Sequence, residues 1–295
     1  MVRLGANQYG KAEVRLVRIA RGAGPEGGDL IRDFNVSSSL SGDLADSHLT
    51  GDNSKVLATD TQKNTVYALS SDLGPVEPEV LALELARHFV TSQKAIKRAR
   101  LKIEEYPWEP VGAAGHSFAR RGGMIRGTRV VHDQKAGTSV VSGVDGLTVL
   151  NTTRSEFWGF PQDPYTTLAE TQDRVLATEV SAWWRFRSAD GFDGPGWAGA
   201  FRAACGALLA AFSETYSYSL QQTLYAMGEA VLGALPEVCE VRLALPNKHH
   251  FLVDLAPFGR ENRSEVYSAA DRPYGLIEGT VLADDAPADP LAWSP

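Results

Sequence analysis

Two kinds of hydrophobic periodicity alternate along this chain, and their order constrains the fold more than any other feature of the sequence. Apolar residues at every second position indicate strands, whereas apolar residues three and four apart indicate helices with one buried face. In the first half we expect strands at residues 8–21, 30–40, 55–58, 96–106, 116–120 and 124–132. We expect helices at 59–69 and 79–90, the second with Leu81, Leu85 and Phe89 on one stripe.

The second half follows the same plan. Extended segments at 138–152 and 176–186 flank a helical turn at 166–170, and two long helices follow at about 201–212 and 220–235. Further strands are expected at 238–245, 250–255, 265–267 and 276–281. Because the order of strands, helices and strands occurs twice, we predict an α+β fold of two modules, residues 1–134 and 135–295. Each module is expected to be an antiparallel sheet with its helices on one face.

The charge balance argues against a nucleic-acid partner. The 295 residues include 29 basic and 36 acidic side chains, which gives a net charge of −7. Nonspecific binding to DNA or RNA depends on Lys and Arg neutralising phosphates. Arg98, Arg100 and Lys102 share one face of a predicted strand, and this basic row fits nucleic acid less well than it fits a solvated or channel-lining face.

Neither a membrane segment nor a targeting signal is expected. The longest apolar stretch, near residues 207–212, is too short to span a bilayer. The first residues have no apolar signal core, and the last four do not form a peroxisomal Ser-Lys-Leu address. We therefore expect a cytoplasmic protein with no membrane partner.

The sequence predicts neither a metal centre nor a dinucleotide site. Cys205 and Cys239 are the only cysteines, and the six histidines form no HxH or HExxH pair, so no metal ligand set is expected. Residues 21–28 formally contain GxGxxG, but this segment joins two predicted strands and not a strand to a helix. A hairpin loop is therefore the better interpretation.

Several dense motifs resemble the cofactor-independent urate oxidases, or uricases. They are Tyr9-Gly-Lys11, the ATD and KNT strings within 51–65, Gly146-Leu-Thr-Val-Leu150, FWGF, YTTL and ET.DR within 155–174, and LPNKH at 245–249. They follow the order and nearly the spacing of that family from Tyr9 to beyond Leu276. The missing Ser-Lys-Leu ending favours the bacterial type.

The resemblance implies tandem tunnelling-fold (T-fold) modules, with four chains forming a hollow barrel. It also implies active sites at the interfaces of a homotetramer, and oxidation of urate by O2 and water to 5-hydroxyisourate and H2O2. No cofactor is implied. The electrons then come from urate, so the protein has to move protons and hold O2 beside the purine.

Five residues match the family's substrate-binding positions. Arg174 matches the guanidinium that takes the urate edge, for which a planar fork of donors is suited. Gln221 matches the opposing amide, and Phe157 matches the ring on which urate stacks. Leu220 and Asp60 match positions whose backbone N–H groups bind the purine. Taken singly, Arg174 would be interpreted as part of a surface ion pair, Phe157 as a core residue and Gln221 as a solvated residue. Only the joint pattern of motifs assigns them to a substrate site.

Four residues match the positions that carry the chemistry. Lys11, Thr59 and His249 match the proton relay, and Asn247 with Thr59 matches the pair that holds O2 or the attacking water. A crowded lysine can act as a base and histidine exchanges protons near neutrality. Taken alone, Lys11 reads as a solvated strand residue, and Thr59-Asp-Thr-Gln62 reads as a helix capping box with Thr59 as the N-cap. His249 and His250 should point to opposite faces of a strand, so we expect only His249 to face the pocket.

Two alternatives to a urate-oxidising enzyme remain open. One is a T-fold purine or pterin binder without turnover, for which Arg174, Gln221 and Phe157 would suffice. The other is a metal-dependent hydrolase of the same fold, which the lack of ligand spacing disfavours. The relay residues favour the enzyme. Because these site residues are divided between the two modules, we expect the site to form where modules of different chains meet.

Overall fold

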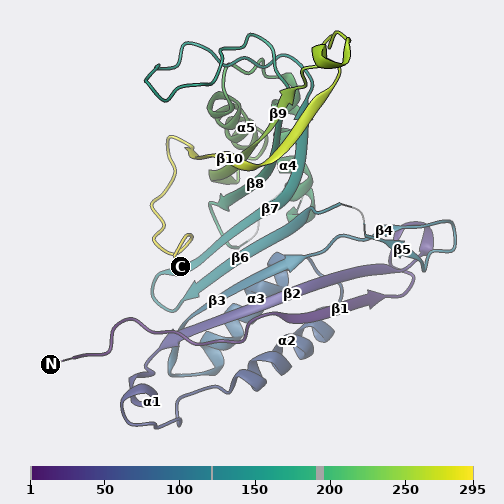
Figure 1. The fold of residues 1–295 in the computed structure, drawn as a ribbon. Helices are drawn as coiled ribbons and strands as arrows, with labels where there is room; N and C mark the ends of the chain where they lie inside the picture. Colours follow the sequence, from purple (N-terminus) through teal and green to yellow (C-terminus); the bar gives the residue numbers. More distant parts are fainter. Residues whose placement is uncertain (1, 121, 191–195, 295) are drawn as a thin grey trace.

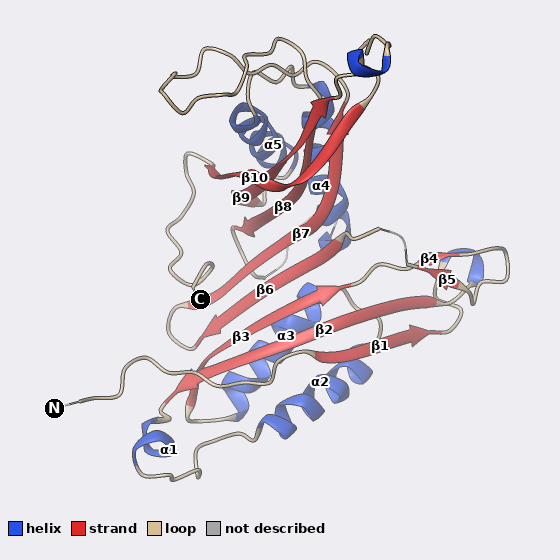
Figure 2. Ribbon diagram, in the orientation of Figure 1, coloured by secondary structure: helices blue, strands red, loops and turns tan. Residues whose placement is uncertain are grey.

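A single antiparallel sheet runs through the whole molecule (Figures 1 and 2). The computed structural model describes residues 2–120, 122–190 and 196–294. The sheet has 8 strands in the order β1-β2-β3-β6-β7-β8-β9-β10. Their bounds are β1 Val14–Ala20, β2 Leu30–Gly42, β3 Ile96–Glu105, β6 Ile125–Asp133, β7 Gly137–Asn151, β8 Leu176–Phe186, β9 Val238–Leu252 and β10 Tyr267–Leu282. A separate pair, β4 Glu109–Pro110 and β5 Phe118–Ala119, forms a small hairpin.

Four long helices pack against one face of this sheet (Figure 1). They are α2 Thr59–Leu73, α3 Pro78–Ser92, α4 Gly196–Glu214 and α5 Leu220–Ala234; the shorter helices are α1 Ala45–Leu49, η1 Pro25–Gly27 and η2 Ala256–Phe258. Helix α3 contacts β3 and β6, and α5 contacts β9 and β10. The predicted α+β fold, with an antiparallel sheet and helices on one face, is confirmed. In the described part of the chain, no helix has the length and apolar character needed to cross a bilayer.

Alternation along the strands separates the helix-covered face from the opposite one, which we call the open face. In β3, Ala99, Leu101 and Ile103 are fully buried beneath the helices. Arg98, Arg100 and Lys102 occupy the positions between them and therefore lie on the open face. Hydrophobic burial thus fixes the register of the sheet and leaves its second face polar and basic.

A buried ionic network lies where the two halves of the sheet join. Arg126 on β6 donates to Glu79 on α3 at 2.7 Å, and Ser142 on β7 donates to the same carboxylate at 2.6 Å. Glu79 is fully buried, and burial raises its pKa. Arg126 also lies over the Phe201 ring of α4 at 4.8 Å. Since β6 and β7 pair directly through the turn that we predicted as a boundary, the sheet continues across it. The division into modules at residues 134 and 135 stays a prediction.

Three local predictions are wrong. Residues 55–58 form no strand, because Val56 N–H closes a turn on the Asn53 carbonyl. Residues 166–170 form no helical turn but an irregular loop. Thr166 N–H donates to the Asp163 carbonyl and the Thr166 hydroxyl donates to the Asp163 side chain, which closes a tight turn just before this loop. The strands predicted at 238–245 and 250–255 belong to one continuous β9, which ends at Leu252, and those at 265–267 and 276–281 belong to one β10, which begins at Tyr267.

Pro246 explains why the sequence predicted two strands where β9 is continuous. A proline has no N–H for the ladder, so the sequence favoured a break at this position. In the sheet Pro246 pairs with Leu276, next to the point where the register of β9 and β10 shifts between Ala270 and Gly275. On the other side of β9, the β8 ladder has no pair at Pro246 between Thr178–Asn247 and Ser181–Ala244, so β9 runs through the position that lacks an N–H.

Candidate active site

The loop between β7 and β8 places Phe157 beside Arg174. Its ends are closed by backbone bonds: Arg174 N–H donates to the Ser155 carbonyl at 2.9 Å, and Phe157 and Thr171 exchange two bonds at 2.8 and 3.0 Å. Asp173 secures the closure by accepting from the Thr153 hydroxyl at 2.9 and 3.0 Å. As a result the Arg174 Cζ lies 5.2 Å from the centroid of the Phe157 ring.

Strand β9 supplies Asn247 and His249. Asn247 pairs with Thr178 on β8 and with Gly275 on β10, and His249 pairs with Ala270. The intervening residues of β10 form the irregularity described above, and such bulges commonly re-aim side chains beside active sites. The His249 ring stacks on Phe251 with centroids 5.7 Å apart. Strand β9 and the neighbouring bulge thus hold the Asn247 amide and the His249 imidazole two residues apart along the strand.

Four of the predicted site residues line one cavity of about 720 Å³, namely Phe157, Arg174, Asn247 and His249. The loop residues 167–171 and the strand residues up to Leu252 complete much of its wall. His250 also borders this cavity, which corrects the expectation that only His249 would do so. The cavity follows β9 to Leu252, so it meets residues from both faces of the strand.

The electrostatics of this cavity suit a planar anion. Arg174 is partly buried, burial lowers its pKa, and its Nε is buried with no acceptor among the described residues. Burial, and secondly the Arg174 charge, lowers the pKa of His249. A guanidinium with unused donors therefore lies near an imidazole that is neutral at neutral pH. Such a pair can bind an anion and accept a proton.

The start of α5 lies next to the loop that carries Phe157. Glu156 N–H donates to the Ser217 carbonyl at 2.7 Å, and the Ser219 hydroxyl caps α5 by accepting from Gln222 N–H at 3.2 Å. Leu220 is buried and Gln221 is exposed. Neither lines the 720 Å³ cavity, and their backbone N–H groups have no acceptor within the described chain. These first-turn groups are available to a ligand at the helix N-terminus.

Lys11, Thr59 and Asp60 form a second group. Asp60 accepts from Lys63 at 2.6 Å, and this hydrogen bond, with a smaller contribution from the Lys11 charge, lowers its pKa. The predicted capping role of Thr59 is wrong: the N-cap of α2 is Ala58, with no side-chain cap bond. Thr59 is exposed, and its hydroxyl has no hydrogen-bond partner among the residues described. It is therefore free for another role.

Gln62 connects two segments that carry predicted site residues. The sequence predicted a capping-box role for it, which the structure does not show. It is fully buried. Its Oε1 accepts from the Ser38 hydroxyl at 2.8 Å, and its Nε2 donates to the Leu57 carbonyl at 3.2 Å. Ser38 in turn receives Lys11 N–H at 3.3 Å. One side chain thus connects the segment that carries Lys11 with the segment that precedes Thr59. The spacing could have indicated that Gln62 is buried, because it lies four residues before Val66 on the buried stripe of α2.

The two groups are not brought together within one chain. Helix α2 packs at the β1 end of the sheet, whereas α5 and β9 lie at the opposite end (Figure 1). Lys11, Thr59 and Asp60 are absent from the lining of the cavity that contains Arg174. In the described part of the chain, no three His, Cys, Asp or Glu side chains are grouped as metal ligands.

Comparison with known proteins identifies the family. A profile described as uricase matches residues 7–131 and 140–278. The uricase of Arthrobacter globiformis is 47% identical over 99% of this chain and 93% of its own length, and that of Dictyostelium discoideum is 36% identical over 95% and 98%. The crystal structure of the Arthrobacter globiformis uricase superposes with a TM-score of 0.91 at 46% identity, covering 98% of each chain. The chain therefore belongs to the uricase family.

Proposed function

We propose that this protein is a urate oxidase that converts urate, O2 and water into 5-hydroxyisourate and H2O2 without a cofactor. The observation that carries the proposal is that Phe157, Arg174, Asn247 and His249 line one cavity in a chain of the uricase family. Urate gives two electrons to O2, which leaves as peroxide, and water adds one oxygen to the purine. Atoms and electrons balance without a further oxidant.

Urate is bound through its ring and its acceptor edge. The purine stacks on Phe157, and Arg174 donates to it with the unused N–H groups of its guanidinium. Gln221 holds the opposite edge. The backbone N–H groups of Leu220 and Asp60, each in the first turn of a helix, complete the set of donors for the anion.

Proton transfer uses Lys11, Thr59 and His249. The free hydroxyl of Thr59 passes a proton between urate and Lys11, and the neutral imidazole of His249 exchanges protons with the reacting water. Asn247 and Thr59 hold O2, and then water, over the purine plane. Holding the reactants in line lowers the entropic part of the barrier, because the collision is replaced by a bound arrangement.

The complete site forms between chains in a homotetramer shaped as a hollow barrel, with its sheets lining the channel. Two observations support this assembly. Helix α2, which begins with Thr59 and Asp60, packs at the β1 end of one sheet, whereas β9, which carries Asn247 and His249, lies toward the opposite end (Figure 1). Strands β1 and β10 are both sheet edges. An edge presents unpaired N–H and C=O groups, which pairing with another chain satisfies.

A peroxide assay tests the reaction. After exhaustive chelation, the protein is mixed with urate and air, and urate absorbance and peroxide are followed. We expect one peroxide per urate consumed. Tight urate binding without peroxide would instead identify a binder, and activity lost to the chelator would contradict the cofactor-free reaction.

Subunit complementation tests the interface site. Thr59→Ala chains and Arg174→Ala chains are each expected to be nearly inactive, and mixed tetramers should regain activity. With random mixing, about a quarter of the sites combine an intact Thr59 from one chain with an intact Arg174 from another. No recovery in tetramers verified to contain both chains would place the whole site within one chain.

A further inference from the structure

The open face of the sheet carries a cavity whose described lining is basic or hydroxylic. This cavity, of about 330 Å³, is bordered by Ser37, Ser38, Ser39, Arg100, Lys102, Arg129 and Ser294. Across the strands, Ser39 lies opposite Arg100, Ser37 lies opposite Lys102, and Lys102 lies opposite Arg129. It shares no lining residue with the cavity that contains Arg174. In a protein of net charge −7, this concentration of positive charge needs a physical explanation.

Neighbouring basic residues form ion pairs, whereas Arg100 and Arg129 form none among the described residues. Arg98 donates to Asp133 at 2.8 Å, and Lys102 donates to Glu104 at 2.6 Å. Arg100 reaches only the neutral Gln8 amide at 3.2 Å, and its Nε is buried without a partner. Arg129 has neither a hydrogen bond nor an ion pair among the described residues. Arg129 faces Lys102 and lies diagonally from Arg100 across the two strands, and like charges placed in this way repel. The Asp145 carboxylate offsets part of the Arg129 charge, but neither guanidinium forms an ion pair among the described residues.

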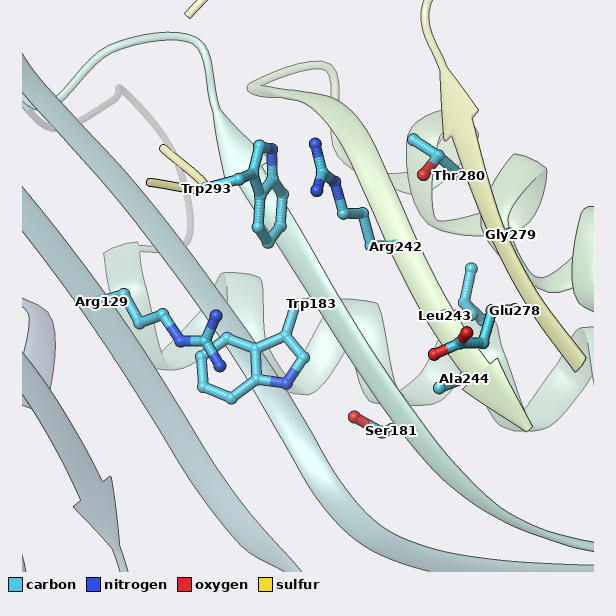
Figure 3. A pocket seen from close by; sticks show the side chains of 10 residues that line it. All are labelled: Arg129, Ser181, Trp183, Arg242, Leu243, Ala244, Glu278, Gly279, Thr280 and Trp293. Carbon is cyan, nitrogen blue, oxygen red and sulfur yellow. The ribbon is translucent and has the colours of Figure 1, made fainter. Parts of the chain in front are cut away.

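The Arg129 guanidinium is held in place on Trp183. Its Cζ lies 4.2 Å from the ring centroid, and Figure 3 shows the group lying against the indole. The ring itself lies flat on Gly127 and Gly143, where an added Cβ would come within 2.3 and 2.4 Å of it. Trp183 Nε1 donates to Asp145 at 3.1 Å, which fixes the ring in its plane. Stacking uses the face of the guanidinium and leaves its N–H edge for a ligand.

We propose that this cavity binds a phosphate-type oxyanion between Arg100 and Arg129. Guanidinium groups match the oxygen geometry of a phosphate through paired charge-assisted bonds. The hydroxyls of Ser37 and Ser39, on the facing strand β2, are placed to donate further bonds. Because the cations are already positioned, binding costs little side-chain entropy. Burial, reinforced by the Arg98 and Arg129 charges, lowers the pKa of Arg100. Burial also lowers the pKa of Arg129, although the Asp145 charge partly opposes this, and a bound anion would relieve both shifts.

Calorimetric titration of the assembled protein with inorganic phosphate tests the proposal. Glycerol 2-phosphate is titrated in parallel to distinguish an ester from the free ion, and chloride at matched ionic strength is the control anion. We expect saturable binding of phosphate or its ester that chloride does not reproduce. Arg129→Gln and Arg100→Gln should each weaken it about tenfold or more, because each removes a charge-assisted donor.

Arg242→Gln is the matched control, since Arg242 lies on the same face, stacks on Trp293 at 4.0 Å, and lies outside the cavity lining. It should leave phosphate binding unchanged. If Arg129→Gln does not fold, Arg129→Lys keeps the charge but loses the fork, and it too should weaken binding. The absence of saturable binding, or equal weakening by all three neutral substitutions, would overturn the proposal. Urate turnover measured alongside should stay unchanged in the variants.

Discussion

The Oε1 atom of Gln62 accepts a hydrogen bond from the Ser38 hydroxyl at 2.8 Å, and both side chains are buried. Since Ser38 also bonds the backbone of Lys11, and Gln62 also bonds the carbonyl of Leu57, this pair fixes the spacing between the two segments that carry the proposed relay. A buried polar pair of this kind is costly to break, because each orphaned group loses its partner without regaining water.

Gln62→Met should therefore lower kcat about tenfold or more while KM for urate changes little, because Lys11 and Thr59 lose their alignment. The unfolding free energy should fall by about 1–3 kcal/mol through the unpaired Ser38 and Leu57 groups. Steady-state kinetics and denaturant unfolding measure the two effects. Val66→Ala, a buried change one turn later on the same helix face, is the control: it should destabilise similarly and leave kcat intact. Equal kinetic losses in both variants would assign Gln62 a purely structural role.

Thr59 and Arg174 should give opposite kinetic patterns. Thr59→Ala removes the hydroxyl of the proposed proton relay, so turnover should fall more than urate affinity. Arg174→Ala removes the charge that we propose holds the urate anion, so affinity should be lost first. Urate binding measured without O2, together with turnover in air, separates the two. The reverse pattern would mean that the relay and binding roles are exchanged.

The acid side of the pH profile should report His249. Because burial and the Arg174 charge lower its pKa, the imidazole stays neutral to a lower pH than a free histidine, and activity that needs it should fall only below that ordinary value. Arg174→Gln should raise the pKa of His249 by removing the positive charge. NMR titration of the His249 ring in the wild-type protein and in Arg174→Gln measures this. An unchanged or lower value in Arg174→Gln would contradict the assignment.

The Arg126 network should contribute strongly to stability. Arg126→Met leaves the fully buried Glu79 carboxylate without its guanidinium, at a cost of about 3–5 kcal/mol. Arg187→Met breaks the more exposed pair with Asp285 and should cost about 0–1 kcal/mol. Denaturant unfolding at one chain concentration compares them, because assembly adds to apparent stability. Similar losses would show that the network contributes no more than a surface pair.

Both cysteines should be unreactive in the native protein. Burial raises the pKa of Cys205 to about 11 and also raises that of Cys239. At pH 8 few thiolates form, and the thiolate is the reactive species. Labelling with a thiol reagent should therefore be slow until denaturant unfolds the chain, and then count two thiols. Rapid native labelling of either cysteine would show that its region opens readily.

Much of the local structure follows from the sequence. The alternation of Phe34, Val36 and Leu40 predicts β2 and its buried face, and the stripe of Leu81, Leu85 and Phe89 predicts α3. The hairpin at 21–28 follows from its glycines and its flanking strands. These predictions succeed because hydrophobic periodicity is a local property, so burial of one face needs no knowledge of the partner. The motifs that indicate the family are local in the same way.

The site itself is only partly accessible from the sequence. The resemblance assigned Phe157, Arg174, Asn247 and His249, and the fold brings them into one cavity. Spacing could place Gln62 on the buried stripe of α2, but it could not predict its bond to Ser38. Neither the passage of β9 through Pro246 nor the stacked Arg129 followed from any spacing. Each depends on a partner far along the chain: Ser38 for Gln62, Leu276 on β10 for Pro246, and Trp183 for Arg129.

The sequence by itself determined which segments become strands or helices, which of their faces are buried, and the family to which the chain belongs. Only the tertiary structure decided which polar groups satisfy one another, that Thr59 leaves its hydroxyl free, and that the two groups of predicted site residues lie on elements at opposite ends of one sheet. The physical reason is that burial of a face depends on local composition, whereas pairing of a polar group depends on which distant residue the fold brings to it.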